Sequence, residues 1–311
     1  MDDRNKQRSR RAVLALLALW LPVAASSCSI KKMAVNKVGD ALAESGTTFT
    51  SDDDPELIEA ALPFSLKLME SLLAESPEHE GLLTSVASGF TQFAFAFVHA
   101  RGDELEALDL DAALAEWERA RRLYARARDY GLRGLELRYA GLGEALAEDP
   151  VGAVAEAELD DLPLLYWTAV SWAGVIVLSK DDPDSIGDLP MVDALIKRAL
   201  ELDESFDHGA IHNFLITYEM SAPGSSESAV ERARAHFERV LELTAGELVS
   251  PFVALAENVA VSEQNRDEFD ALLERALAVD LEARPEWRLA NEIYQRRARW
   301  LRGQGDQLIL D

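Results

Sequence analysis

One uncharged run in the middle of the chain constrains the fold more than any other feature. Leu162 to Ser179 reads LPLLYWTAVSWAGVIVLS and carries no charge, although 28% of the residues in the chain are charged. A run of this length is at the lower limit for a membrane span. Pro163 suits the first turn of a helix, and the hydroxyls, glycine and tryptophans of the run suit a protein interior. Because a helix that is apolar on all sides is buried in a larger helical assembly, we predict a central helix here, surrounded by other helices.

One face of this predicted helix combines hydroxyl groups with an indole. Helical spacing places Thr168, Ser171, Trp172, Val175 and Ser179 on the same side. The hydroxyls can be satisfied within ordinary helix packing. Alternatively, the face lines a groove or channel, since ligand sites are concave and mostly apolar with a few polar groups. The sequence leaves both interpretations open.

The charge of the chain limits its partners. The 311 residues carry a formal net charge of -25, and the first 27 residues are basic, so the acidic excess lies in the remainder. A field this negative repels nucleic acid and anionic lipid surfaces, which argues against nucleic-acid binding and favours a cationic partner. Cys28 is the only cysteine, which excludes an internal disulfide and a multi-cysteine zinc site.

The N-terminus has the pattern of an export signal. A basic head precedes the apolar run from Ala12 to Ala25, which has signal-peptide length and ends in small residues. The sequence Ala25-Ser26-Ser27-Cys28 then resembles a bacterial lipoprotein box, in which the peptide is cut before an acylated cysteine. We predict a lipoprotein signal peptide over 1–27, lipidation of Cys28 and a tether over 28–54. Each buried methylene of the acyl chains contributes about 0.8 kcal/mol to such an anchor.

Two alternatives remain open at this end of the chain. Cleavage by the ordinary signal peptidase, or an uncleaved anchor, would also fit the apolar run. The stretch from Ser9 to Leu14 (SRRAVL) resembles a twin-arginine export signal. Ser29 after the cysteine favours the outer membrane over the inner membrane by analogy with other lipoproteins.

The region 55–311 shows helical periodicity and internal repeats. Residues 193–203 (DALIKRALELD) resemble residues 270–280 (DALLERALAVD), and ERVLEL at 238–243 resembles KRALEL at 197–202. The arginines of these copies are 41 and 36 residues apart, near the tetratricopeptide period of about 34. We predict an all-α domain, a superhelical array of degenerate tetratricopeptide-like helix pairs, with another helical bundle as the alternative. The predicted second helices carry small–large–small motifs at Ala113-Trp117-Ala120, Val192-Ile196-Ala199, Ala233-Phe237-Val240 and Phe269-Leu273-Ala276.

The sequence carries no recognisable catalytic motif. It lacks a nucleophile elbow, a phosphate loop and a dinucleotide fingerprint. His208 and His212 could share a helix face, but two histidines need a third ligand to hold a metal. We therefore predict no catalysis, no cofactor and no metal site.

Aromatic residues are the better candidates for ligand contact. Tyrosine and tryptophan offer large apolar area with one polar group, and they either fill the core or line the inner wall of the array. The candidate ligand or lumen residues are Trp117, Tyr124, Tyr166, Trp167, Trp172, His212 and Tyr218.

The last predicted helix, over 285–301, is unusually basic for this chain. It could cap the array, bind a partner, or be solvated and paired with acidic neighbours. Its arginines, with one just beyond it, are Arg288, Arg296, Arg297, Arg299 and Arg302.

Residues 161–169 (DLPLLYWTA), followed by Trp172, resemble the LYWTA region of the TRAP transporter T-component (TatT) family. Further similar stretches follow in order. They are LPMVDALIKRALELD at 189–203, Gly209-x-x-His212-x-Phe214-Leu215, AHFER at 235–239, and QNRD at 264–267 with Phe269. Asn265 departs from the aspartate that the family often has.

The resemblance implies a non-enzymatic, periplasm-facing lipoprotein that associates with the solute-binding protein of a tripartite ATP-independent periplasmic transporter. It further implies a homotrimer with a channel through each protomer, and a small hydrophobic or carboxylate-bearing ligand. The alternative is a general tetratricopeptide-repeat scaffold lipoprotein for envelope or outer-membrane protein assembly.

Overall fold

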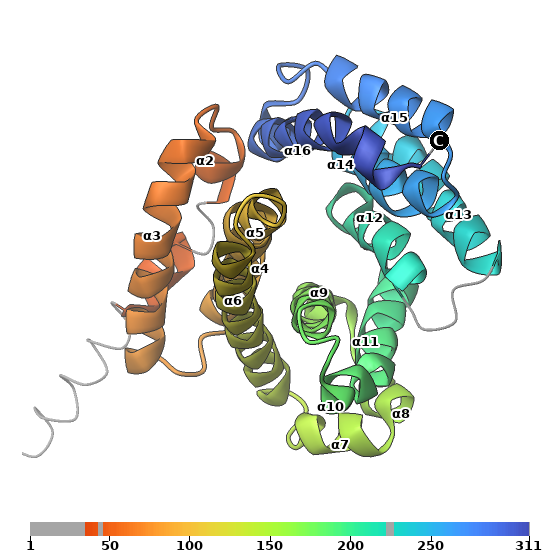
Figure 1. Ribbon diagram of the computed structural model, residues 1–311. Helices are drawn as coiled ribbons and strands as arrows, with labels where there is room; N and C mark the ends of the chain where they lie inside the picture. The colour runs from red at the N-terminus through yellow and green to blue at the C-terminus, as the bar shows by residue number, and fades with distance from the viewer. Residues whose placement is uncertain (1–34, 43–45, 222–226, 311) are drawn as a thin grey trace, which may run out of the picture.

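The computed structural model describes residues 35–42, 46–221 and 227–310, and every regular element in these ranges is a helix (Figure 1). The predicted all-α class is confirmed. The tetratricopeptide-like superhelix stays a prediction. Cys28 and the predicted signal peptide lie outside the described residues.

The helices follow one another around the molecule in three groups. The first comprises α2 (Gly46–Thr50), α3 (Pro55–Glu75), α4 (Glu80–Phe93), the π-helix η1 (Ala94–His99), α5 (Ala100–Leu105) and α6 (Leu110–Glu136). The second comprises α7 (Leu142–Glu148), α8 (Pro150–Val154), η2 (Leu159–Asp161), α9 (Leu162–Val177), α10 (Pro183–Gly187) and α11 (Leu189–Leu202). The third comprises α12 (Phe206–Ser221), α13 (Glu227–Thr244), α14 (Ser250–Leu255), the π-helix η3 (Ala256–Ala260), α15 (Arg266–Ala278), η4 (Pro285–Trp287) and α16 (Arg288–Leu308).

Helix starts follow from capping residues in the sequence. The Asp54 side chain accepts a hydrogen bond from the Leu57 amide at 2.9 Å, and Pro55 occupies the first turn of α3. Asp109 caps α6 through the Ala112 amide at 3.1 Å. These carboxylates satisfy amide groups that a helix N-terminus leaves unpaired.

Consecutive long helices pack as pairs. α4 packs on α6, α9 on α11, α12 on α13, and α14 with η3 on α15. The predicted small residues are buried, because Ala113, Ala120, Ala199 and Ala276 have no exposed surface. Small side chains let paired helices approach closely, which is why the motifs mark the second helix of each pair.

The predicted central helix is confirmed as α9. Eleven of its 16 residues are buried, and Trp172 is only 6% exposed. It lies so close to α6 that a side chain at Gly174 would collide with the Tyr124 ring, and one at Gly131 with Thr168. By length and composition, the described helix that could cross a membrane is Glu80–Leu105, and half of its most apolar window is buried.

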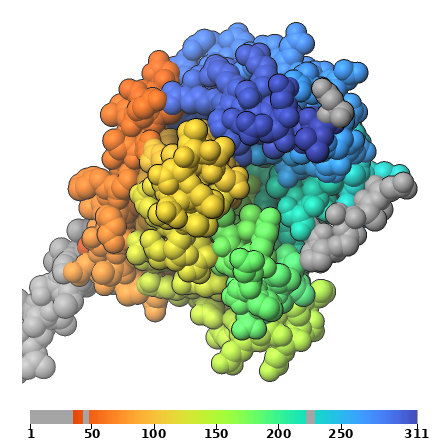
Figure 2. All heavy atoms as spheres, viewed as in Figure 1, coloured from red at the N-terminus to blue at the C-terminus, as the bar shows by residue number. Residues whose placement is uncertain are grey.

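The chain closes into a ring because α16 returns to the first helices. α16 contacts α2 and α3, and Arg296 Nη1 lies 2.6 Å from Glu56 Oε1 across 240 residues. The rings of Phe95 on η1 and Tyr294 on α16 are 5.8 Å apart. Figure 2 shows α5 in yellow, α9–α11 in green, α12 in teal and α16 in blue around a hollow on the viewed face.

Part of the predicted tether packs on the folded body. Residues 35–42 are helical, and the Ser76 hydroxyl donates to Asn36 Oδ1 at 2.7 Å. His79 Nε2 lies 3.3 Å from Asp40 Oδ1. Residues 35–42 therefore contact the turn between α3 and α4, so the folded body extends N-terminal to Pro55.

Candidate functional site

The ring closes through a partly buried charge cluster, which we call the seam and define as His99, Asp103, Trp117, Glu257 and Arg297. Asp103 Oδ1 accepts a hydrogen bond from Trp117 Nε1 at 3.0 Å, and Asp103 Oδ2 lies 2.9 Å from Arg297 Nη2. The same Nη2 also contacts Glu257 Oε1. One guanidinium thus joins carboxylates from the first and last groups of helices.

Two π-helices supply two of the five seam residues. His99 ends η1, and Glu257 lies in η3. A π-turn inserts an extra residue into an α-helix and turns the following side chains to a new direction, and such turns are frequent at functional sites. In this chain the two π-helices lie on either side of Arg297.

The electrostatics of the seam follow from burial. Burial acts to lower the pKa of Arg297, but the carboxylates of Glu257 and Asp103 outweigh it and raise that pKa, so the guanidinium stays charged. Its Nη1 atom is buried without a hydrogen-bond partner in the described residues. Burial lowers the pKa of His99 even though Asp103 opposes this effect. The seam therefore sets the charged guanidinium of Arg297 beside the acidic side chains of Asp103 and Glu257, while the charged form of His99 is disfavoured.

Three buried or half-buried tyrosines, Tyr124, Tyr166 and Tyr294, lie on α6, α9 and α16. Burial raises the pKa of Tyr124, Tyr166 and Tyr294. The charge of Asp103 contributes for Tyr124, that of Asp207 contributes for Tyr166, and Tyr294 acts on both.

The hydroxyls of these tyrosines are only loosely engaged. Tyr124 Oη lies 3.4 Å from His99 Nδ1, and Tyr166 Oη donates to the Ala210 carbonyl at 3.4 Å. Within the described chain, the Tyr294 hydroxyl makes no hydrogen bond. They can accordingly meet a small molecule without first breaking strong internal bonds.

A left-handed turn at Asp207 follows Phe206, whose ring packs on Tyr166 with centroids 5.4 Å apart. Asp207 (φ 42°), His208 (φ 57°) and Gly209 (φ 88°) all have positive φ, a region that non-glycine residues seldom occupy. Burial raises the pKa of Asp207, and the neighbouring His208 only partly opposes this. Strained backbone and a perturbed carboxylate together are typical of functional sites. We call Tyr166, Trp167, Phe206, Asp207 and Tyr294 the inner cluster.

The family model for the TRAP transporter T-component matches residues 51–309. The chain belongs to this family. An uncharacterized protein of Treponema pallidum (strain Nichols) is 28% identical over 307 residues, which cover 92% of this chain and 94% of that protein. The protein is therefore an accessory component of a TRAP transporter system, and the seam and inner cluster lie within its family domain.

Five of the seven predicted ligand residues lie in the seam, in the inner cluster or in a partly buried aromatic pair of the T-component. Trp117 and Tyr124 lie at the seam, through Asp103 and His99. Tyr166 and Trp167 are in edge contact at 4.8 Å in the inner cluster. Tyr218 is half-buried and stacks on Phe214 at 5.4 Å.

The other two predicted residues have engaged polar atoms. Trp172 Nε1 donates to Asp188 Oδ2 at 2.9 Å, at the start of α11. His212 Nδ1 lies 2.8 Å from His236 Nδ1, and His212 Nε2 lies 3.2 Å from Glu204 Oε2. The left-handed turn breaks the helical register that would have placed His208 and His212 on one face. In the part of the chain that the structure describes, no group of three or more His, Cys, Asp or Glu side chains is arranged so that it could hold a metal ion.

Sequence reasoning missed most of the charged residues of the site. The sequence marks Arg297 only as one of several basic residues of the last helix. Nothing in the sequence pairs it with Asp103 or Glu257, because the contact depends on ring closure and on two π-helices. The remaining missed residues are His99, Asp207 and Tyr294.

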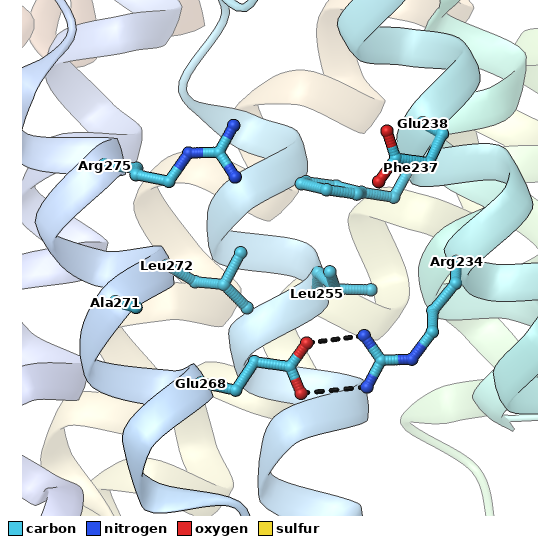
Figure 3. Close-up of a pocket in the computed structure, with 8 residues that line it drawn as sticks. All are labelled: Arg234, Phe237, Glu238, Leu255, Glu268, Ala271, Leu272 and Arg275. Carbon is cyan, nitrogen blue, oxygen red and sulfur yellow. Dashed lines mark hydrogen bonds and ion pairs between the residues drawn. The ribbon is translucent and has the colours of Figure 1, made fainter.

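A separate groove lies between α13 and α15 (Figure 3). It has a volume of about 250 Å³ and an apolar floor that includes Phe237 and Leu272. Arg234 Nη2 pairs with Glu268 Oε2 at 2.8 Å at one end of the view, and Arg275 lies at the other. The groove shares no residue with the seam or the inner cluster.

Proposed function

We propose that this T-component is a non-enzymatic, periplasm-facing lipoprotein that docks the solute-binding protein of its transporter and holds a small ligand within its ring. The observation that carries the proposal is the closure of the helices around the inner cluster. A concave, mostly apolar region with a few polar groups is the usual form of a small-molecule site. Passage of a hydrophobic or carboxylate ligand through such a ring is what the family resemblance implies.

Exposed leucines at the α5–α6 turn are our candidate docking surface for the solute-binding protein. Leu108, Leu110 and Leu114 are 83%, 55% and 53% exposed. Exposed apolar groups that lie close together are typical of interaction sites. Figure 2 shows α5, in yellow, beside the hollow of the viewed face, so a partner bound there would also lie next to the ring interior.

The anchor and the oligomeric state belong to the same proposal. Acylated Cys28, after removal of residues 1–27, would hold the protein on the periplasmic side of a membrane, with the outer membrane favoured. A homotrimer is the assembly that the family resemblance implies. Mass spectrometry of the mature N-terminus tests the anchor, and an unmodified Cys28 thiol would refute it.

Capture of the solute-binding protein tests the main proposal. We expect the purified T-component to retain the solute-binding protein of its own transporter at low salt, and Leu110→Glu with Leu114→Glu to reduce capture at least tenfold. Leu310→Glu is the matched control, because Leu310 is 76% exposed outside the α5–α6 turn. Absence of capture by folded wild-type protein would refute the docking role.

The groove between α13 and α15 favours the alternative of a general envelope scaffold, because its apolar floor could hold a peptide segment. That function predicts that Leu272→Glu abolishes partner capture while the leucine variants do not. The opposite result supports docking at the α5–α6 turn.

A further inference from the structure

We propose that the groove between α13 and α15 binds a free α-amino acid with an apolar side chain. Arg275 pairs with the carboxylate of this ligand, and Glu238 pairs with its ammonium group. The groove shares no residue with the seam or the inner cluster, so this site is additional to the one in the ring and does not depend on the proposed docking role.

Two opposite charges line the groove at the same end. Glu238 on α13 and Arg275 on α15 both belong to its lining, and Figure 3 shows them at the end away from Arg234. Within the described residues they form no ion pair, with each other or with another side chain. Because the chain carries 56 acidic and 31 basic residues, an arginine without an acidic partner is unexpected. A ligand that carries both charges can bridge the two groups.

The guanidinium of Arg275 is held over a pair of packed aromatic rings. Its Cζ lies 4.5 Å from the centroid of the Phe252 ring, and Phe252 meets Phe237 edge-on with centroids 5.7 Å apart. The two rings are 3% and 4% exposed, so packing fixes them. A cation–π contact attracts the charge without an acceptor oxygen. The N–H donors of the guanidinium therefore remain for a carboxylate, which they can bind in a bidentate fork.

The rest of the groove suits an apolar side chain. Its floor is formed by Phe237, Leu255 and Leu272, which belong to the apolar core of the third group of helices. At the opposite end, both carboxylate oxygens of Glu268 accept hydrogen bonds from Arg234, so these two charges are already paired (Figure 3). Recognition of charge is therefore confined to one end of the groove, and the middle offers apolar contact.

The size and the charges of the groove favour an amino acid over other ligands. Sites that enclose drug-sized molecules measure roughly 300–1,000 Å³, whereas this groove has about 250 Å³. A simple carboxylate would place its negative charge near Glu238, and a simple amine would leave Arg275 unpaired. An internal peptide segment offers neither charge, but a free amino acid carries both at pH 7.

Calorimetry with four probes of similar size tests the charge requirement. We expect L-leucine to bind the full-length protein at least tenfold more tightly than 4-methylpentanoate, which lacks the ammonium group, and than 3-methylbutylamine, which lacks the carboxylate. N-acetyl-L-leucinamide carries neither charge, represents a peptide segment and should also bind at least tenfold more weakly. Absence of leucine binding, or binding of any analogue within tenfold of leucine, would overturn the proposal.

Substitutions at the two charges test the residues. Arg275→Gln should weaken leucine binding about tenfold and remove the preference over 3-methylbutylamine, whereas Glu238→Gln should weaken it about tenfold and remove the preference over 4-methylpentanoate. Both side chains are exposed, so both variants should keep the wild-type melting temperature. Glu274→Gln and Arg302→Gln, at exposed residues outside the groove, are the controls and should bind leucine like wild type. Unchanged leucine affinity in either groove variant, or an equal loss in the controls, would refute the assignment. These readouts do not involve the solute-binding protein, so they leave the capture result to be judged separately.

Discussion

Arg297 is the residue through which the stability of the closed ring can be tested most directly. Replacement by methionine keeps most of the aliphatic volume and removes the charge shared by Asp103 and Glu257. The two carboxylates would then face each other without a cation, in a region from which much water is excluded.

The magnitude follows from the burial of the three side chains. Loss of one partner of a fully buried charge pair costs about 3–5 kcal/mol. Here the exposed fractions are 16% for Arg297, 24% for Asp103 and 33% for Glu257, so water screens part of the interaction. We expect Arg297→Met to lower the free energy of unfolding by about 2 kcal/mol. For a domain of this size, that is a fall in melting temperature of about 4–8 °C.

Arg296 provides the matched control on the same helix. It also closes the ring, through Glu56, but the two side chains are 43% and 70% exposed. Exposed pairs contribute about 0–1 kcal/mol, so Arg296→Met should change the melting temperature little.

The assay is thermal and urea unfolding followed by circular dichroism and by tryptophan fluorescence, to which Trp117 contributes through the indole that donates to Asp103. The triple variant Arg297→Met, Asp103→Asn, Glu257→Gln removes all three charges and should recover most of the lost stability. Equal costs for Arg296→Met and Arg297→Met would refute the claim that partial burial makes the seam stronger than an exposed ion pair.

Two further predictions concern pH and packing. Burial lowers the pKa of His212 and of His236, so the unfolded chain binds more protons, and the free energy of unfolding should fall as the pH drops below about 6.5. In urea unfolding between pH 7.5 and 5.5, His236→Gln should flatten this dependence. An unchanged slope would contradict the role given to His236. A Cβ at Gly174 would lie 2.7 Å from the Tyr124 ring, so in the same assay Gly174→Ala should lower the free energy of unfolding by about 1–3 kcal/mol. Gly187→Ala is the control and should leave it unchanged, because a Cβ there would have nothing within 4 Å. Equal effects of the two alanines would contradict the close approach of α6 and α9.

The parts of the fold that depend on local sequence were predictable. The uncharged run over 162–179 indicated a buried central helix because charged side chains would otherwise occupy some of its faces, and α9 is buried as expected. The small residues of the repeat motifs likewise predicted helix contacts, as Ala199 and Ala276 show. In both cases the pattern reports on neighbours within one or two helical turns.

The candidate site depends on features that such patterns do not report. Asp103 and Arg297 meet only because the array closes on itself, and the side chains of His99 and Glu257 are directed by π-helices that no residue type specifies. The turn at Asp207 and His208 was missed because two non-glycine residues occupy left-handed backbone. Assuming an unbroken helix there also led to the wrong register for His208 and His212.

The distribution of apolar contacts indicates where the ring is weakest. The apolar core of α4 and α6 is joined to the core of α9 and α11 through α9 itself, since Val175 belongs to the former and Trp172 to the latter. α12 joins the core of α9 and α11 to the third core in the same way, through Leu215 and Ile216. Of the three cores in the described ranges, none spans the contact between α16 and the first helices, where the closing contacts are ion pairs and the meeting of Phe95 with Tyr294.

A joint that lacks an apolar core opens at lower free energy than the cores that flank it. We therefore expect amide hydrogen exchange to be faster in α16 than in α9, and Arg297→Met to accelerate it in α16 and in η1–α5 while exchange in α9 is unchanged. Opening at this joint would give a ligand access to the inner cluster without unfolding any of the helix pairs. Uniform acceleration across all helices would instead mean that the ring unfolds as one unit and that the seam has no separate motion.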